Sequence, residues 1–139
     1  MDIEGAYRVR IVGVILTLML SFALQASENV LVVHSYHQGF FWTDNFQEGL
    51  AQRLDTHQIP KRVFYLDSKR LQTPEYFAQL ENLFKTKLEQ ESFKAIIVSD
   101  NNALNMMQNL HEYIGDTPVI FGGINNYSPK LHQDLNATG

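Results

Sequence analysis

The stretch that decides the fold is residues 30–45, VLVVHSYHQGFFWTDN. Its first four residues are apolar and run directly into a polar segment, residues 34–37. An unbroken apolar run, as opposed to an alternating one, is typical of a strand buried on both faces of a parallel sheet. The polar and aromatic residues that follow would then lie at the carboxyl end of that strand, where open α/β sheets hold their ligands.

The rest of the chain repeats this strand-then-helix pattern. We expect strands at residues 30–35, 62–66, 95–98 and 118–121. We expect the first helix at residues 44–56, where Asp44 and Gln47 have capping-box spacing. Thr73 and Pro74 predict the start of the second helix, since they supply a cap and a proline at the first position.

Strands that alternate with amphipathic helices predict an α/β fold with a parallel, doubly wound (Rossmann-like) sheet. The expected strand order is 2-1-3-4. A short helical turn is expected at residues 128–129, and no closing element is expected after it.

The N-terminus has the pattern of a targeting segment. Arg8 and Arg10 precede an apolar stretch at residues 11–24, and Ala26 offers a cleavage point. The apolar stretch is shorter than the roughly 20 residues of a spanning helix. Residues 1–26 are therefore predicted to be a signal peptide, with an uncleaved N-terminal anchor as the alternative. Either way, residues 27–139 are expected to be periplasmic or otherwise extracytoplasmic.

Composition excludes several classes of function. Residues 27–139 suffice for one hydrophobic core, not for two domains. The formal net charge is −4, so the surface carries no electrostatic footprint for nucleic acid. The chain has no cysteine, so an oxidising compartment would impose no disulfide and no thiol chemistry.

All four expected strands end in polar residues, and the carboxyl ends of parallel strands share one edge of the sheet. Hydroxyls, carboxylates and an amide would gather there, a set that recognises a polar small molecule, with an indole to cover its apolar part. For each residue the alternative is a helix cap or a turn. The expected ligand contacts are Ser35, Tyr36, Trp42, Asp67, Ser99, Asp100 and Asn125.

Metal and catalytic sites are not expected. His34 and His37, even with Asp100 nearby, lack the spacing of a known metal signature. Ser35 and Ser99 lie outside a Gly-x-Ser-x-Gly elbow, and the sequence places no base beside either hydroxyl. A glycine pair after the fourth strand lacks the rest of a dinucleotide fingerprint. We therefore assign no catalytic residue, no metal and no cofactor.

Several segments together resemble a known family. They are residues 34–37 with Gly39, residues 42–44 with Gly49, and then residues 65–70, 97–103 and 118–125. In order, they resemble the strand segments of the ABC-transporter substrate-binding-protein-like domain. The resemblance implies a type I periplasmic-binding-protein fold, in which a ligand lies between two lobes of comparable size. This chain supplies one lobe, so residues 27–139 are expected to be the N-terminal lobe, a fragment of a larger domain.

The resemblance implies two branches of function. Some members are free substrate-binding proteins of uptake systems, and others are extracytoplasmic sensor domains of membrane histidine kinases and diguanylate cyclases. The segments at residues 34–37 and 99–102 are more similar to the sensor branch. The expected function is a small-molecule sensor domain without catalysis. Its expected partners are a small-molecule ligand, a second lobe and a membrane kinase or cyclase.

Three alternatives stay open at this point. The first is the substrate-binding component of an ABC uptake system, with a permease as partner and amino acids as candidate substrates. The second is a small exported hydrolase. The third, a cytoplasmic flavodoxin-like or receiver-like domain, is disfavoured by the signal segment. It is also disfavoured because no acidic pair follows the first strand to hold a receiver's metal ion.

The first prediction concerns export. The mature protein should begin near Ser27, because the basic start, the apolar stretch and Ala26 together match a cleavable signal. Intact-mass measurement of the exported protein checks this. A full-length mass recovered from the membrane fraction would show an anchor instead.

Overall fold

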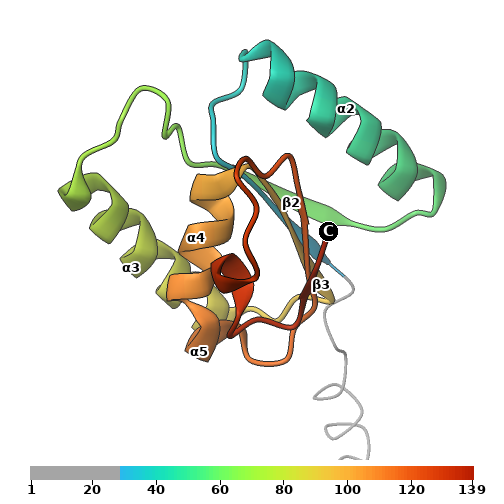
Figure 1. Ribbon diagram of the computed structural model, residues 1–139. Helices are drawn as coiled ribbons and strands as arrows, with labels where there is room; N and C mark the ends of the chain where they lie inside the picture. Colours follow the sequence, from blue (N-terminus) through green and yellow to red (C-terminus); the bar gives the residue numbers. More distant parts are fainter. Residues whose placement is uncertain (1–28) are drawn as a thin grey trace, which may run out of the picture.

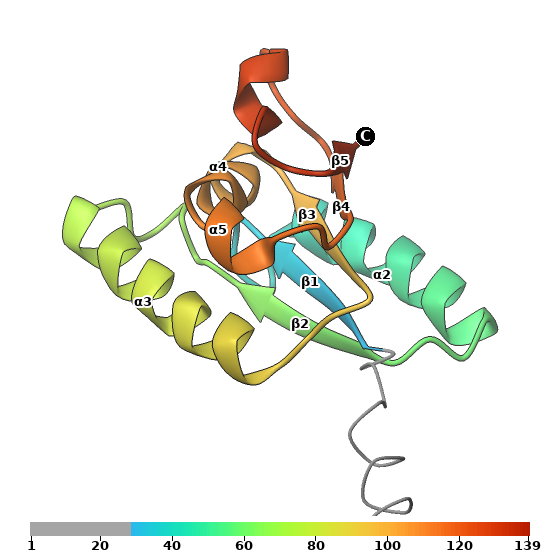
Figure 2. The same cartoon turned by 90° about the horizontal axis from the view of Figure 1, so that it is seen from below.

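The computed structural model describes residues 29–139, so the predicted signal segment and its cleavage point lie outside the described residues. The described chain forms a five-stranded sheet in which every pairing is parallel, with strand order β2-β1-β3-β4-β5. Helices cover both faces of the sheet (Figures 1 and 2). The predicted Rossmann-like α/β fold and the order of its first four strands are therefore confirmed.

The strands are β1 (Val30–His34), β2 (Lys61–Tyr65), β3 (Ala95–Ser99), β4 (Val119–Gly122) and β5 (Ala137–Thr138). The helices are α2 (Phe41–Thr56), α3 (Pro74–Gln90), α4 (Asn101–Asn109), α5 (His111–Ile114) and the 3-10 helix η1 (Pro129–His132). None of these described helices is both long and apolar enough to cross a membrane.

Strand β1 is an interior strand of the sheet, and all five of its residues are buried. It pairs with β2 on one side and with β3 on the other. Leu31 and Val33 face the larger hydrophobic cluster, whereas Val30 and Val32 face a smaller one that includes Leu54 of α2. The unbroken apolar run therefore reflects burial on both faces, as the sequence predicts.

The helices divide unequally between the two faces of the sheet. Helix α2 lies on one face, while α3, α4 and α5 lie on the other (Figure 2). This division follows from right-handed crossovers, because the chain moves from β1 outward to β2 and then back across β1 to β3 and β4. The larger cluster is accordingly built from Phe84 of α3 and from Leu104, Met107 and Leu110 of the α4 region.

The predicted starts of α3 and α2 have different outcomes in the structure. The Thr73 side chain accepts a hydrogen bond from the Tyr76 N–H at 3.2 Å, so the predicted cap of α3 is confirmed. The predicted capping box of α2 is wrong. The helix begins at Phe41, and Asp44 instead accepts a hydrogen bond from the Gly39 N–H at 3.0 Å. Gly39 has φ of 93°, and this sharp turn lets the helix begin three residues earlier than predicted.

The end of the described chain also differs from expectation. The short turn at residues 128–129 is confirmed as the start of η1, but a fifth strand follows it. Ala137 and Thr138 pair in parallel with Val119 and Ile120 of β4. Two residues are too few to produce a period-2 pattern, so the sequence holds no recognisable signal for this strand.

The second prediction compares the same substitution at a buried and an exposed leucine. Leu104 is fully buried in the larger cluster, so Leu104→Ala should lower the free energy of unfolding by about 2–5 kcal/mol. Leu83 on α3 is 44% exposed, and Leu83→Ala should change it by only about 0.5 kcal/mol. Urea unfolding of both variants measures the difference, and equal losses would contradict the described core.

Candidate ligand-binding site at the carboxyl ends of the strands

A buried polar layer lies directly beneath the strand ends. His34 is fully buried, with its Nδ1 2.7 Å from Ser99 Oγ and its Nε2 2.7 Å from Gln47 Oε1. An amide oxygen only accepts, so this network assigns the imidazole proton to Nε2 and makes Nδ1 the acceptor of the Ser99 hydroxyl. Burial lowers the pKa of His34, although the Gln47 hydrogen bond and the charge of Asp44 act in the opposite direction. The imidazole is therefore neutral and joins β1, β3 and α2.

Two further hydroxyls complete this layer. Ser35 Oγ donates to the Ser99 carbonyl and accepts from the Ala103 N–H, each at 2.8 Å. Ser68 Oγ donates to the Ser35 carbonyl at 2.6 Å and accepts from Asn102 Nδ2 at 2.8 Å. Ser35 and Ser68 are both fully buried. These bonds tie β1, β2, β3 and α4 together beneath the surface.

Two of the predicted contact residues thus lie inside the fold. The hydroxyls of Ser35 and Ser99 are both buried and both hydrogen-bonded to other parts of the chain. They fix the positions of the residues above them. Any contact with a ligand therefore falls first to the next layer out.

Tyr36 and Asp100 belong to that outer layer. Burial, together with the neighbouring Asp100 carboxylate, raises the pKa of Tyr36 to about 12. Asp100 is 6% exposed, and its Oδ1 accepts from the Asn101 N–H at 2.7 Å as the N-cap of α4. Its backbone has φ of 70° and ψ of 167°, a conformation that is essentially reserved for glycine. The Asp100 N–H donates to the Gly122 carbonyl at 2.9 Å, which holds this conformation in place.

Asp67 is already paired. Arg70 donates to it from Nε at 2.7 Å and from a terminal nitrogen at 2.8 Å, so both carboxylate oxygens are engaged. The hydrogen bonds from Arg70 hold the pKa of Asp67 below its usual value. His37 Nδ1 lies 3.4 Å from Asp67 Oδ1 without hydrogen-bond geometry. The Asp67 carboxylate is therefore already paired with the Arg70 guanidinium.

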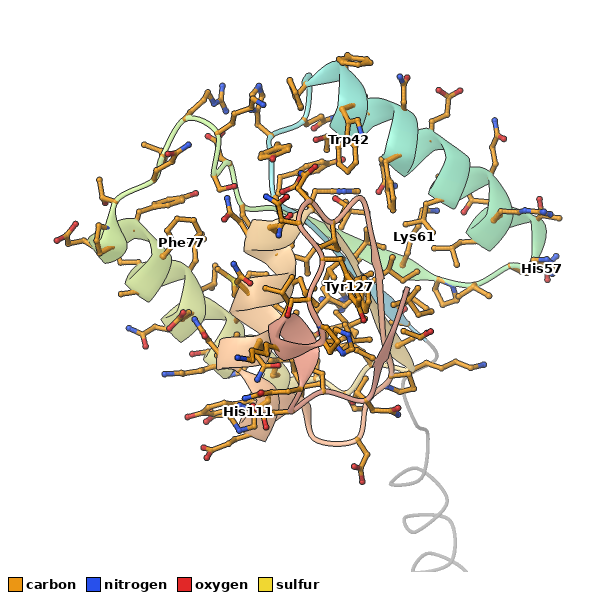
Figure 3. All side chains as sticks on the ribbon, viewed as in Figure 1. Trp42, His57, Lys61, Phe77, His111 and Tyr127 are labelled. Carbon is orange, nitrogen blue, oxygen red and sulfur yellow. The ribbon has the colours of Figure 1, made fainter. Side chains whose placement is uncertain are left out.

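The Trp42 side chain contacts residues that follow the first and the fourth strands. Its indole stacks on Phe46, with ring centroids 5.7 Å apart, and meets the Tyr36 ring edge-on at 6.3 Å. Gly123 lies so close that an added Cβ would be 2.5 Å from the indole. Gly123 also has φ of 71°, so both sterics and backbone favour glycine there. Trp42 thus lies between α2 and the strand ends (Figure 3).

Asn125 is held through its backbone. Its N–H donates to Asn101 Oδ1 at 2.8 Å, and Asn101 Nδ2 donates to its carbonyl at 3.0 Å. This reciprocal pair attaches the loop after β4 to the first turn of α4. The Asn125 residue itself is exposed at the edge.

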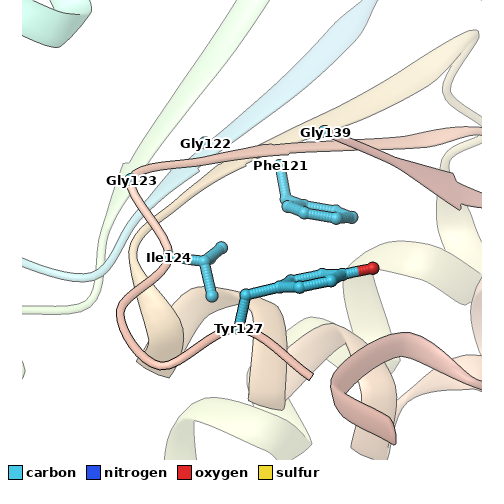
Figure 4. Close-up of a pocket in the computed structure, with 6 residues that line it drawn as sticks. All are labelled: Phe121, Gly122, Gly123, Ile124, Tyr127 and Gly139. Atoms are coloured by element: carbon cyan, nitrogen blue, oxygen red, sulfur yellow. The ribbon is translucent and has the colours of Figure 1, made fainter. Parts of the chain in front are cut away.

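A pocket of about 350 Å³ opens beside this loop, at the carboxyl end of β4. Its size lies at the lower end of the range for small-molecule sites. The rings of Phe121 and Tyr127 face each other in Figure 4, with centroids 6.0 Å apart and planes 20° from parallel. The pocket is lined by Phe121, Gly122, Gly123, Ile124, Tyr127 and Gly139.

The structure brings some of the predicted contact residues together at this edge, and their contact with a ligand stays a prediction. Tyr36, Trp42 and Asp100 lie near one another, and Asn125 reaches them through Asn101. The two aromatic pocket residues, Phe121 and Tyr127, were absent from the predicted contacts. The only signal for them in the sequence is the glycine pair between them, which marks a close backbone approach without saying what approaches.

Lys69 and Phe40 were also absent from the predicted contacts. The Lys69 ammonium lies 4.3 Å from the centroid of the Phe40 ring and 4.7 Å from that of Tyr36. The site therefore includes a cation held by aromatic rings.

Within residues 29–139 no three His, Asp or Glu side chains converge to hold an ion. Both ring nitrogens of His34, the better placed of the two candidate histidines, are engaged in hydrogen bonds.

No protein-family model, curated protein or solved structure matches this chain. The family resemblance and the functions it implies therefore stay predictions. The fold and the geometry of the strand-end edge stand independently of them.

The third prediction is a loss of stability in mild acid. In the unfolded chain His34 should titrate near its ordinary pKa of about 6.5, whereas burial lowers its pKa in the fold. Between these two values the unfolded chain binds the extra proton. The contribution of neutral His34 to stability is thus complete above about pH 6.5 and is lost as the pH falls below it.

Urea unfolding at pH 7.5 and pH 5.5 measures this slope. His34→Gln should flatten it, whereas His57→Gln, at an exposed histidine after α2, should leave it unchanged. Titration of the wild-type His34 ring by NMR gives the folded pKa directly, without a variant. A His34 pKa at or above 6.5 would contradict the described burial.

Proposed function

We propose that the strand-end edge binds a polar small molecule, and that the protein is the extracytoplasmic ligand-binding domain of a signal-transduction protein. Asp100 carries the proposal. It is a nearly buried carboxylate, and within the described chain it forms no ion pair. Its backbone strain is of order 1–3 kcal/mol, a cost that proteins retain at ligand clamps and active sites.

The surroundings of Asp100 support a ligand of mixed character. The Trp42 indole and the Phe121–Tyr127 pocket offer apolar contact, while Asp100 offers a charge and the exposed Asn125 an amide. An apolar or aromatic group would pack against the rings while a cationic or hydrogen-bonding group meets the carboxylate.

Exposed apolar side chains at the same edge support a second body above it. Phe41 is 70% exposed, Tyr127 55% and Leu71 46%, and all three lie in segments that follow a strand end. Apolar side chains gathered at one edge are typical of surfaces that a partner covers. We propose that a second lobe closes over this edge and encloses the ligand.

The sensor and uptake alternatives share this binding step and differ in the partner. The similarity of residues 34–37 and 99–102 to the sensor branch favours a membrane kinase or cyclase over a permease. Export to the periplasm or its equivalent is proposed for both, on the basis of residues 1–26.

The hydrolase alternative has one observation in its favour. Ser99, His34 and Gln47 are arranged as a nucleophile, a base and an orienting group, with both linking distances at 2.7 Å. Ser99 is 1% exposed and His34 is fully buried, so no substrate carbonyl reaches the hydroxyl. We therefore propose that this triad is structural and that the protein is not an enzyme.

The fourth prediction tests the binding role of Asp100 against a role as a helix cap. In the full exported protein, calorimetric titration with a panel of amino acids and small metabolites should identify a ligand. Asp100→Asn should weaken its binding about tenfold or more, because a charged hydrogen bond contributes about 1.5–3 kcal/mol. The unfolding midpoint should hold, since asparagine caps a helix as well as aspartate does.

Two control variants sharpen this test. Asp100→Gly should also lose binding while keeping or raising the midpoint, because glycine adopts φ of 70° and ψ of 167° without strain. Asp116→Asn, at an exposed position away from the strand ends, should leave binding unchanged. Undiminished affinity in Asp100→Asn would leave Asp100 as a helix cap alone.

A further inference from the structure

Lys69 occupies a site made of two aromatic rings. It follows β2, whereas Phe40 and Tyr36 both come from the loop between β1 and α2. The two rings meet edge-on, with centroids 5.4 Å apart and planes at 86°, and the Lys69 ammonium lies within 5 Å of both centroids. A cation at such distances is attracted to the negative face of each ring.

This contact differs from the other lysine–ring contacts in residues 29–139. Lys87 lies 4.6 Å from the Phe64 ring and Lys85 lies 5.7 Å from the Tyr113 ring, each over a single ring. Both of these lysines belong to α3. Within the described residues, only Lys69 lies over two rings, and both rings come from the loop that follows β1.

Ordinary charge pairing does not account for the position of Lys69. The residue is exposed and forms no ion pair within the described chain. Asp67, the carboxylate nearest to Lys69 in the sequence, already accepts hydrogen bonds from Arg70 at both of its oxygens. Lys69 therefore rests on the rings, at the end of a flexible four-carbon stem that can swing away.

The neighbours of the ring pair belong to the proposed ligand site. The Tyr36 ring also meets the Trp42 indole edge-on, with centroids 6.3 Å apart. The Asp100 carboxylate contributes to the raised pKa of the Tyr36 hydroxyl. A group placed over the Tyr36 and Phe40 rings would therefore lie near the Trp42 indole, on the ring whose hydroxyl the Asp100 carboxylate affects.

We infer that the Tyr36–Phe40 ring pair is a cation subsite of the ligand-binding edge, that Lys69 is its resident occupant, and that an alkylated ammonium group on the ligand displaces Lys69. The inference rests on the proposed binding function and adds the chemical class of the ligand. It also assigns the ligand's cationic group to the rings and Asp100, not to Asp67, which Arg70 already neutralises.

The test uses tetramethylammonium chloride as probe and the fluorescence of Trp42, which is the only tryptophan in the chain, as readout. Sodium chloride at the same concentration controls for ionic strength. Lys69 competes as a tethered cation at an effective concentration in the millimolar range. Lys69→Ala should therefore bind the probe at least about threefold more tightly than the wild type, while Lys87→Ala, which frees one ring elsewhere, should not differ from it.

Ring variants in the Lys69→Ala background locate the probe. Phe40→Leu and Tyr36→Leu should each abolish the gain, because leucine keeps apolar volume without a ring quadrupole. Tyr36→Phe should retain it. Circular dichroism melting of each variant verifies that it is folded, and a ring variant that binds the probe as tightly as Lys69→Ala overturns the inference.

Equal probe affinity in Lys69→Ala and wild type also overturns the inference of a cation subsite. So does acetate binding that Lys69→Ala removes while tetramethylammonium binding stays unchanged, since Lys69 would then be an anion partner. A gain in Lys69→Ala supports the subsite even if the metabolite panel finds no ligand, so failure of the binding function and failure of the subsite remain distinguishable.

Discussion

Strand β1 is buried on both faces, and the rest of the structure depends on that constraint. β1 lies between β2 and β3, with hydrophobic clusters above and below it. Its burial extends past the last apolar residue to His34 and Ser35, so their polar atoms must find partners inside the protein. The partners are Ser99, Gln47 and the Ala103 N–H, which come from β3, α2 and α4. One buried network thereby fixes four elements around the strand end.

This network forms a buried floor beneath other strand-end residues, Tyr36 and Asp100 among them. Because the floor fixes the start of α4 and the end of β3, Asp100 is held in a backbone conformation that it would not adopt alone. The Gly122 carbonyl adds a bond from β4, so the strained residue is restrained from two sides. Tyr36 follows Ser35 directly in the chain, so its position depends on this buried layer.

The sequence predicts the fold well, because burial on both faces and the Thr73 cap leave local patterns. It predicts the start of α2 poorly, because the turn at Gly39 outweighs the capping-box spacing that follows it. For the site, topology predicts which residues gather at the edge but not which way they face. Ser35 points inward because the adjacent backbone groups need it, and no local pattern encodes that need. The contact of Lys69 with Phe40 joins two loops and has no sequence signal either.

Two charges at the edge, both outside any described ion pair, act on Tyr36. Lys69 lies over its ring, and the Asp100 carboxylate raises the pKa of its hydroxyl, so this side chain links a cation and an anion. A cation arriving at the ring would take the place of Lys69 on the side chain whose hydroxyl the Asp100 carboxylate affects. The loop after β2 also carries the Asp67–Arg70 pair and leads into α3. Movement of Lys69 would therefore shift the segment that precedes α3. On the proposed function, ligand entry at the first strand end would thus be coupled to a loop on its neighbour, the local change that a sensor needs to transmit.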